Sequence, residues 1–295
     1  MRHGFLRPAS LQILRAGLDA DGRPVAWAHR IVGPSRYASG GGPTTPSPEV
    51  SETYAAQELP YAIPNVRVDY VQVQTPVPLG AWRSVTYSQN GFVSECFVDE
   101  LAAAAGKDPY QFRRELLAAR PPFTIAEKLV DTKRMLAVLD LAAQKSGWSS
   151  RLPTGRGRGI AVGTDHGGFV CHVAEVTAAP GGAVRVDRIV TAIDCGTVVS
   201  PDGVAAQIES AVAFALSGTL EGEITFERGR VRESSYRDFG VVRMSGMPAV
   251  EVHIVPSSEP PGGVGEPGVP PLAPAVANAV FAATGTRVRR LPIRR

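Results

Sequence analysis

Apolar and polar residues alternate along residues 11–18 and again along residues 23–32, on either side of the dipeptide Asp21-Gly22. A period of two is typical of half-buried strands, and Asp-Gly favours a tight turn between them. The start of the chain therefore predicts an antiparallel hairpin. A stretch rich in Gly, Pro, Ser and Thr follows over residues 33–63 and predicts a long irregular excursion with one short helix near residues 50–57.

The pattern changes to helical spacing after a strand expected over residues 68–75. From near Ser88, apolar residues recur on one face of a predicted helix. Asp108 and Asp131 are each suited to cap the start of a further helix, because an aspartate side chain accepts from free backbone N–H groups there. Residues 88–147 are therefore predicted to form a helical block.

The second half of the chain is dominated by strand patterns. Three β-rich stretches follow one another from residue 155 to residue 196, and Ser200-Pro201 then predicts the start of a strongly apolar helix that covers the resulting sheet. Two more strands are expected over residues 224–234 and 249–255. This order favours an α+β fold of mixed, mostly antiparallel sheets packed with helices, rather than alternating βαβ units. We expect two segments, residues 1–150 and 151–295.

The composition is that of an ordinary globular protein, with 295 residues of which 44% are hydrophobic and 20% charged. A formal charge of +3 is too small to indicate a nucleic-acid partner. Cys96, Cys171 and Cys195 are too widely spaced for a disulfide framework or an iron–sulfur ligand run, so buried free thiols are expected. The first residues lack the apolar run of a signal peptide, and no membrane span is expected.

Several familiar catalytic arrangements are not found in the sequence. The glycine run at residues 155–159 precedes a strand instead of opening a helix, so it does not predict a phosphate loop. The histidines show no metal-ligand spacing, and no GxSxG motif is present, so neither a metal held by protein side chains nor a nucleophilic triad is expected. Glu95, Asp99 and Glu100 are interpreted as a polar helix face, because adjacent helical positions point in different directions.

One carboxylate stands out because of the segment that carries it. Glu266 lies in the run GGVGEPGVPP, in which Gly265 and Pro267 restrict how the side chain can be presented. A helix is expected to begin at Pro274 directly afterwards and to end at Gly285. The simplest interpretation of this loop alone is a surface turn with a solvated glutamate. A carboxylate held at a helix entrance is the alternative.

Two other residues favour a binding site. Arg83 lies in a glycine-preceded turn between a strand and a helix, where backbone amides beside an arginine are suited to an anion. Gln207 lies at the edge of an apolar helix face, where a buried amide must find partners. It is expected either to bind a neighbouring loop or to meet a polar ligand.

Four segments in order resemble the large subunit of molybdenum hydroxylases, the xanthine dehydrogenase and aldehyde oxidase family. They are GAWRSVTYSQNGFVSECFVDELAAAAGKDPYQFRRELL, IDCGTVVSPDGVAAQIESAVAFALSGTLEGEITF, MPAVEVHIV and GVGEPGVPPLAPAVANAVFAATGTRVRRLP. Within the family, the chain is most similar to beta subunits of the isoquinoline 1-oxidoreductase type. The likeness extends over nearly the whole chain and implies a molybdopterin-binding domain fold.

The resemblance assigns roles to the residues already singled out. It implies that Glu266 is the catalytic base, which takes a proton so that a water-derived oxygen attacks an electron-poor carbon. It also implies that Gly80, Ala81, Trp82 and Arg83 border the molybdenum site, that Gln207 contacts the pterin, and that Gly265 belongs to the cofactor-binding residues. The cofactor implied is a molybdenum–molybdopterin of the cytosine dinucleotide type, whose metal is held by the pterin dithiolene.

The resemblance covers only the C-terminal part of such subunits, whose upstream glycine-rich loops are not found here. A fragment, a misassigned start and one half of a split subunit all remain open, and any export signal is expected upstream. We expect that the chain needs the N-terminal half of the large subunit to hold the cofactor, and that iron–sulfur clusters lie on a small [2Fe-2S] partner subunit. The activity implied is hydroxylation of an isoquinoline-like N-heteroaromatic compound. Aldehyde oxidation and a non-catalytic assembly module are the alternatives.

Overall fold

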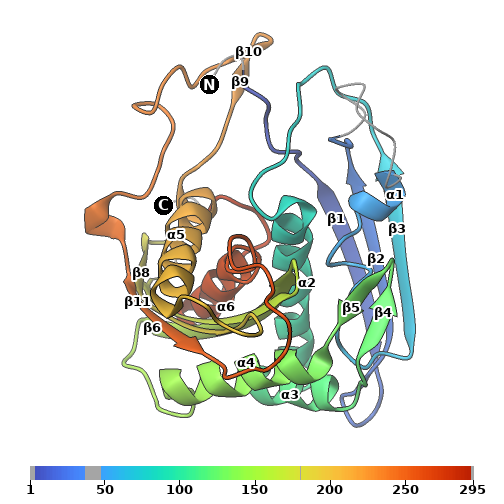
Figure 1. Ribbon diagram of the computed structural model, residues 1–295. Helices are drawn as coiled ribbons and strands as arrows, with labels where there is room; N and C mark the ends of the chain where they lie inside the picture. Colours follow the sequence, from blue (N-terminus) through green and yellow to red (C-terminus); the bar gives the residue numbers. More distant parts are fainter. Residues whose placement is uncertain (1–3, 37–47, 180, 294–295) are drawn as a thin grey trace.

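The computed structural model describes residues 4–36, 48–179 and 181–293. A three-stranded sheet opens the chain (Figure 1). In it, β1 (Leu11–Leu18) pairs antiparallel with β2 (Pro24–Gly33), which confirms the predicted hairpin, and β2 pairs parallel with β3 (Asn65–Gln72). The predicted third strand is therefore present but begins and ends three residues earlier than expected.

The excursion between β2 and β3 contains the helix α1 (Pro48–Ser51), which is shorter than expected. Turns replace the helix after Ser51, and Ala55 adopts a left-handed conformation with φ 66° that interrupts helical hydrogen bonding. Much of the Gly- and Pro-rich part of the excursion lies outside the described residues.

The helical block is confirmed in three helices. These are α2 (Val85–Ala104), α3 (Pro109–Ala118) and α4 (Thr132–Ser146). Asp108 and Asp131 cap α3 and α4 through their side chains, as the sequence predicts. A short hairpin of β4 (Phe123–Ile125) and β5 (Lys128–Val130), which the sequence analysis did not predict, separates α3 from α4.

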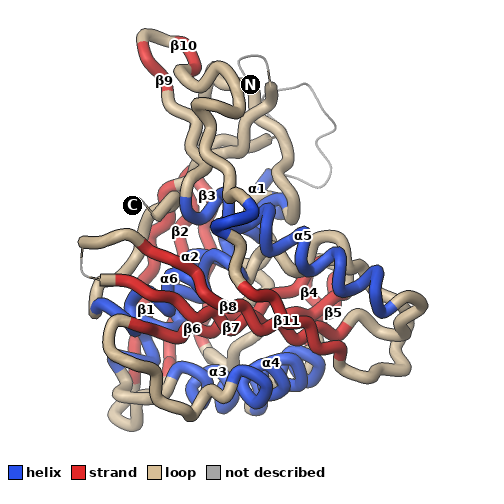
Figure 2. Tube along the Cα trace, turned by 90° about the vertical axis from the view of Figure 1, so that its left-hand side faces the viewer, coloured by secondary structure: helices blue, strands red, loops and turns tan. Residues whose placement is uncertain are grey.

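A four-stranded sheet with the order β11-β8-β7-β6 forms the centre of the second half (Figure 2). Three of its strands are the predicted β-rich stretches, β6 (Arg156–Asp165), β7 (Gly168–Ala178) and β8 (Val184–Asp194), and they pair antiparallel. The last strand, β11 (Ala249–Ile254), pairs parallel with β8. The α+β class with mixed, mostly antiparallel sheets is therefore confirmed.

Helices cover both faces of this sheet (Figure 1). On one face lie α5 (Pro201–Leu220) and α6 (Leu272–Thr284), both at the expected places, and α4 lies on the other. By length and composition alone α5 is apolar enough to cross a membrane. Nevertheless, Ile208, Val212 and Leu216 are fully buried in the protein core, as a core helix requires.

The glycine run at residues 155–159 has a packing role. A Cβ on Gly157 would lie 2.1 Å from the carbonyl oxygen of Ala279, and one on Gly159 would lie 2.2 Å from its backbone nitrogen. These distances are shorter than any real contact, so α6 approaches β6 this closely only because both strand residues are glycine. Since α6 follows the Glu266 loop directly, this packing also fixes where the loop ends.

An extended arm projects between α5 and β11 (Figures 1 and 2). The strand expected over residues 224–234 is instead a small hairpin of β9 (Phe226–Glu227) and β10 (Arg230–Val231), and the 3-10 helix η1 (Met244–Gly246) follows it. Arg228 has φ 49° and Gly229 has φ 76°, so a tight turn divides the apolar run at its middle.

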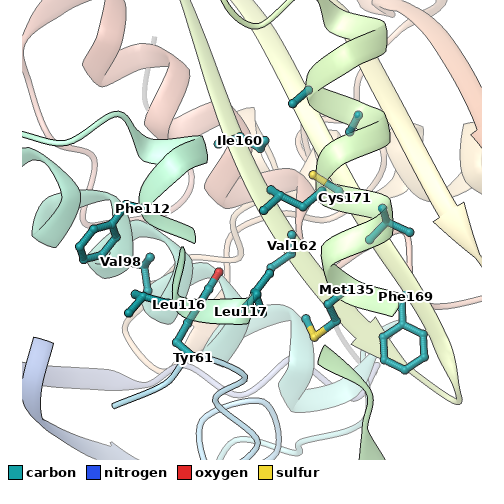
Figure 3. Close-up of a cluster of buried hydrophobic side chains, with 14 of the residues drawn as sticks. Tyr61, Val98, Phe112, Leu116, Leu117, Met135, Ile160, Val162, Phe169 and Cys171 are labelled. Atoms are coloured by element: carbon teal, nitrogen blue, oxygen red, sulfur yellow. The ribbon is translucent and has the colours of Figure 1, made fainter. Parts of the chain in front are cut away.

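The largest buried cluster joins the two halves of the chain (Figure 3). Tyr61, Val98, Phe112 and Leu117 from the first half meet Phe169 and other residues of the four-stranded sheet. A second cluster fills the opposite face of that sheet beneath α5 and α6. The sheet is thus buried on both sides, which explains why its strands consist largely of apolar residues.

The interpretation of Glu95 and Asp99 as a polar helix face is wrong, because both side chains are buried. The Nε atom of Arg113 donates to Glu95 over 2.9 Å, and Nη1 lies 3.5 Å from Asp99. Glu95 also accepts from the hydroxyl of Tyr61 and from the backbone N–H of Val162 in β6. The carboxylates tie α2 to α3 and to the sheet instead of facing water.

We predict that Arg113→Met destabilises the chain by about 3–5 kcal/mol, because it leaves two buried carboxylates without their cation. Arg114→Met is the matched control, since the neighbouring Arg114 is 46% exposed and pairs with Asp140 at the surface. Its cost is expected to stay below about 1 kcal/mol. Urea unfolding followed by circular dichroism measures both variants, and equal losses would contradict the account.

Candidate active site around Glu266

Glu266 lies in the loop between β11 and α6, and the start of α2 holds it there. The backbone N–H of Ser84 donates to Oε1 of Glu266 over 2.8 Å, and the Ser84 hydroxyl donates to the Glu266 carbonyl over 2.7 Å. The two residues are 182 positions apart in the chain. Glu266 is therefore not a freely solvated turn residue, although its side chain is still 33% exposed.

The turn at Ser84 is in an unusual conformation. Ser84 has φ 68° and Val85 has φ 48°, so two successive non-glycine residues adopt the left-handed region. Such residues cost of the order of 1–3 kcal/mol each and persist where the surrounding structure fixes them, often at functional sites. Here the conformation places the Ser84 N–H against the carboxylate. Sequence analysis missed Ser84, because nothing in its local pattern predicts a positive φ.

Arg83 connects the Glu266 loop to α5. Its Nε donates to the carbonyl oxygen of Gly265 over 2.6 Å, and its Nη2 donates to the same oxygen. On α5, Nη1 donates to the Ser210 hydroxyl over 3.1 Å and Nη2 to Oε1 of Gln207 over 3.3 Å. Burial lowers the pKa of Arg83, and the nearby Glu266 charge raises it. One guanidinium thus gathers three of the residues that the sequence singled out.

Gln207 is exposed, not buried as its position in the sequence suggested. The helix α5 turns its apolar residues to the core, and Gln207 lies on the side that faces Arg83. The amide oxygen therefore satisfies a neighbouring loop, which was one of the two outcomes expected for it.

The segment before Arg83 packs against the start of the chain. Gly80 donates its N–H to the carbonyl of Leu6 over 3.0 Å, and a Cβ on Gly80 would lie 2.7 Å from the Cβ of Phe5. Trp82 lies with its ring 4.6 Å from that of Phe214 on α5. Ala81 between them is exposed. Only Arg83 among these four loop residues has a described hydrogen bond to the Glu266 loop.

A histidine that the sequence analysis left unassigned completes the site. His166 lies in the tight turn between β6 and β7, and its Nδ1 is 3.2 Å from Oε2 of Glu266 and 2.8 Å from Oδ1 of Asp165. A signal was present in the sequence, because Asp-His-Gly-Gly between two strands predicts a hairpin turn that presents polar side chains at the sheet edge. Only the fold brings this turn to the Glu266 loop.

Asp165 is almost completely buried, and its Oδ2 has no hydrogen-bond partner among the described residues. Burial raises the pKa of Asp165 to about 6, against the lowering effect of His166. Asp165, His166 and Glu266 each offer a ligand atom within 4.8 Å of the others. Because the imidazole nitrogen already lies at hydrogen-bond distance from both carboxylates, we interpret them as a hydrogen-bonded group.

The surroundings of Glu266 fit a polar or anionic cofactor. A Cβ on Gly265 would meet no described atom within 4 Å, so open space adjoins the loop beside the catalytic candidate. The Arg83 guanidinium and the exposed Gln207 amide supply donors at its border. The largest described cavity, of about 560 Å³, instead lies on the three-stranded sheet and is lined by residues such as Arg15 and Arg67. It shares no residue with the Glu266 site.

Two family models described as molybdopterin cofactor-binding domains match residues 3–117 and 111–248. The chain is 30% identical to a nicotinate dehydrogenase polypeptide of Pseudomonas putida over 97% of its own length, and 28% identical to the beta subunit of isoquinoline 1-oxidoreductase from Brevundimonas diminuta over 99%. Aldehyde oxidoreductase from Desulfovibrio gigas has the same fold, with a TM-score of 0.78 at 17% identity over 99% of this chain. The chain belongs to the molybdopterin-binding large subunits of the molybdenum hydroxylase family.

The chain spans only part of these proteins. It covers 25% of the length of the nicotinate dehydrogenase polypeptide, 37% of the isoquinoline oxidoreductase polypeptide and 49% of the aldehyde oxidoreductase chain. It therefore corresponds to part of a molybdopterin-binding subunit.

We predict that Asp165→Asn becomes more stable relative to the wild type as the pH rises from about 4 to above 6. The raised pKa means that the folded wild type holds a proton which the unfolded chain has lost, so ionisation of Asp165 destabilises the fold over this range. A pKa of about 6 against 3.8 corresponds to at most about 3 kcal/mol at 1.36 kcal/mol per unit. Chemical unfolding at pH 4 and pH 7 measures the difference, and a pH-independent difference would contradict the account.

Proposed function

We propose that this chain carries the catalytic base and part of the cofactor site of a molybdenum hydroxylase that hydroxylates an N-heteroaromatic substrate with water as the oxygen source. The observation that carries the proposal is the clamped position of Glu266 beside Arg83 and open space, in a chain of this family. Its carboxylate has one oxygen on the Ser84 N–H and the other near His166, so its orientation is restricted before substrate arrives.

Glu266 acts in this proposal as the general base. A carboxylate that is one-third exposed can receive a proton and return it to water, while the Ser84 N–H stabilises its ionised form. When bound, the molybdenum–molybdopterin supplies the oxygen to be transferred and takes up the electrons of the oxidised carbon. The chain contributes proton acceptance and positioning.

Gln207, Gly265 and Arg83 are the residues of this chain that we assign to cofactor binding. The Gln207 amide and the Arg83 guanidinium offer N–H donors for pterin or phosphate oxygens, and the lack of a side chain at Gly265 leaves room for close approach. Gly80, Ala81 and Trp82 are proposed to border the same site, because they set the path of the chain into Arg83. A cofactor of the cytosine dinucleotide type is part of the proposal.

The substrate class is supported by two relatives, named for nicotinate and isoquinoline, which are both aromatic compounds with a ring nitrogen. Aldehyde oxidation by the same site is the second candidate, because the aldehyde oxidoreductase of Desulfovibrio gigas shares the fold. Turnover of a panel of N-heteroaromatic compounds and aldehydes by the assembled enzyme distinguishes the two.

The partners proposed are the N-terminal half of the large subunit and a small [2Fe-2S] subunit. Electrons that leave the oxidised substrate need a path to an acceptor, and three buried, separated cysteines in this chain do not supply cluster ligands. A non-catalytic assembly module is the rival from another class. Molybdenum that is not acquired in any complex of this chain would favour that rival.

We predict that Glu266→Gln in the assembled enzyme lowers kcat by at least about 100-fold, because the isosteric amide cannot accept a proton. Its molybdenum content should remain that of the wild type. Glu259→Gln is the matched control, since Glu259 is an exposed residue of the same loop, and it should retain full turnover. Steady-state kinetics with metal analysis measures all three proteins, and undiminished turnover of the Glu266 variant would contradict the proposal.

We predict that Gln207→Leu lowers the molybdenum content of the purified complex several-fold, because the substitution keeps the helix but removes the amide donors. Gln89→Leu, on the half-buried face of α2 and outside the site, serves as the control. The ratio of molybdenum to protein by elemental analysis gives the result. Equal metal contents would remove Gln207 from the proposed cofactor site.

A further inference from the structure

We propose that His166, oriented by Asp165, is the residue through which Glu266 releases its proton to water. The inference rests on the proposed function and adds to it a residue that the resemblance did not assign. A single ring nitrogen, Nδ1, lies within hydrogen-bond distance of both carboxylates, 3.2 Å from Oε2 of Glu266 and 2.8 Å from Oδ1 of Asp165. The oxygen that faces His166 is not the one bound by Ser84.

The backbone fixes this meeting of side chains. His166 has φ 49° in its turn, and its carbonyl accepts from the N–H of Gly263 over 2.8 Å. A Cβ on Gly168 would lie 2.4 Å from the carbonyl oxygen of Gly263, and one on Gly262 would lie 2.5 Å from that of Gly167. The hairpin turn and the Glu266 loop therefore lie in direct backbone contact, so the His166–Glu266 distance does not depend on side-chain flexibility alone.

Exposure differs sharply among the three side chains. His166 is 64% exposed, Glu266 is 33% exposed, and Asp165 is 3% exposed. A proton on Glu266 thus has a neighbour that reaches farther into solvent, and that neighbour is held from behind by a buried carboxylate. This order from buried anchor to exposed ring is suited to carrying a proton outward.

The transfer balances in protons and involves no electrons. The O–H bond at Oε2 of Glu266 breaks and an N–H bond forms at Nδ1 of a neutral ring that carries its hydrogen on Nε2. The resulting imidazolium lies between two carboxylates, which stabilise it. The Nε2 proton then passes to water, so that Glu266 is ionised again, and the exposed ring recovers its first tautomer by exchange with solvent.

Other charged groups act on the same cluster. Lys128, on the β4–β5 hairpin, favours the ionised form of Asp165, and Tyr87 on α2 lies close enough to Asp165 for its own pKa to be raised in part by that charge. On the opposite side of Glu266, Arg83 interacts with the carboxylate. These groups are unchanged in the variants below, so any difference reports the His166–Glu266 pair.

The first test uses the assembled enzyme. His166→Gln should lower kcat about 10-fold and move the acid limb of the pH profile to higher pH, because the removed imidazolium no longer favours the ionised base. Imidazole added to His166→Ala should restore part of the loss. His253→Gln, in which a half-buried histidine near Glu251 is replaced, should keep the wild-type profile. A His166→Gln profile within two-fold of the wild type at every pH would overturn the proposal.

The second test needs no turnover and leaves His166 in place. In the 295-residue chain with EDTA present, the NMR signals of the His166 ring are followed against pH. Glu266→Gln should move their titration midpoint to lower pH by about 0.5 unit or more, because a negative charge 3.2 Å away is removed, and Glu259→Gln should not. An unchanged midpoint overturns the relay even if Glu266→Gln abolishes turnover, whereas full turnover of Glu266→Gln refutes the base assignment itself.

Discussion

The contact between residues 83–84 and residues 265–266 is the constraint on which the rest of the site depends. Arg83 holds the Gly265 carbonyl, and Ser84 holds both the carbonyl and the carboxylate of Glu266. These bonds join segments 182 positions apart, and they require the left-handed turn at Ser84 and Val85. The cost of that turn is offset by fixing one carboxylate in one orientation.

Packing far from Glu266 is needed to bring the two segments together. The close approach of α6 to β6, made possible by Gly157 and Gly159, determines where the preceding loop ends. The buried group around Arg113 determines where α2, and with it Ser84, meets the sheet. The glycines and buried charges therefore contribute to the site through position and not through contact with it.

Much of the fold follows from local patterns in the sequence. The β1–β2 hairpin, the aspartate-capped helices and the strands β6 to β8 agree with alternation, capping and turn residues. The parallel pairing of β11 with β8 and the burial of Glu95 do not, because both depend on partners distant in sequence. The β4–β5 hairpin escaped notice because its strands are only three residues long.

The same distinction applies to the site. Glu266 and Arg83 stand in segments whose glycines and prolines mark them in the sequence, and the structure brings them together. Ser84 and His166 act through a positive φ and a hairpin turn, which no local spacing reveals. A Gln207 side chain at the edge of an apolar face can be either buried or exposed, and the way α5 packs on the core decides.

The most direct measurement is the position of molybdenum in crystals of the assembled enzyme, located by its anomalous scattering. The account predicts a peak beside the Glu266 carboxylate, on the side where Gly265 leaves open space and Gln207 presents its amide. A molybdenum peak away from Glu266 in a fully loaded enzyme would contradict it.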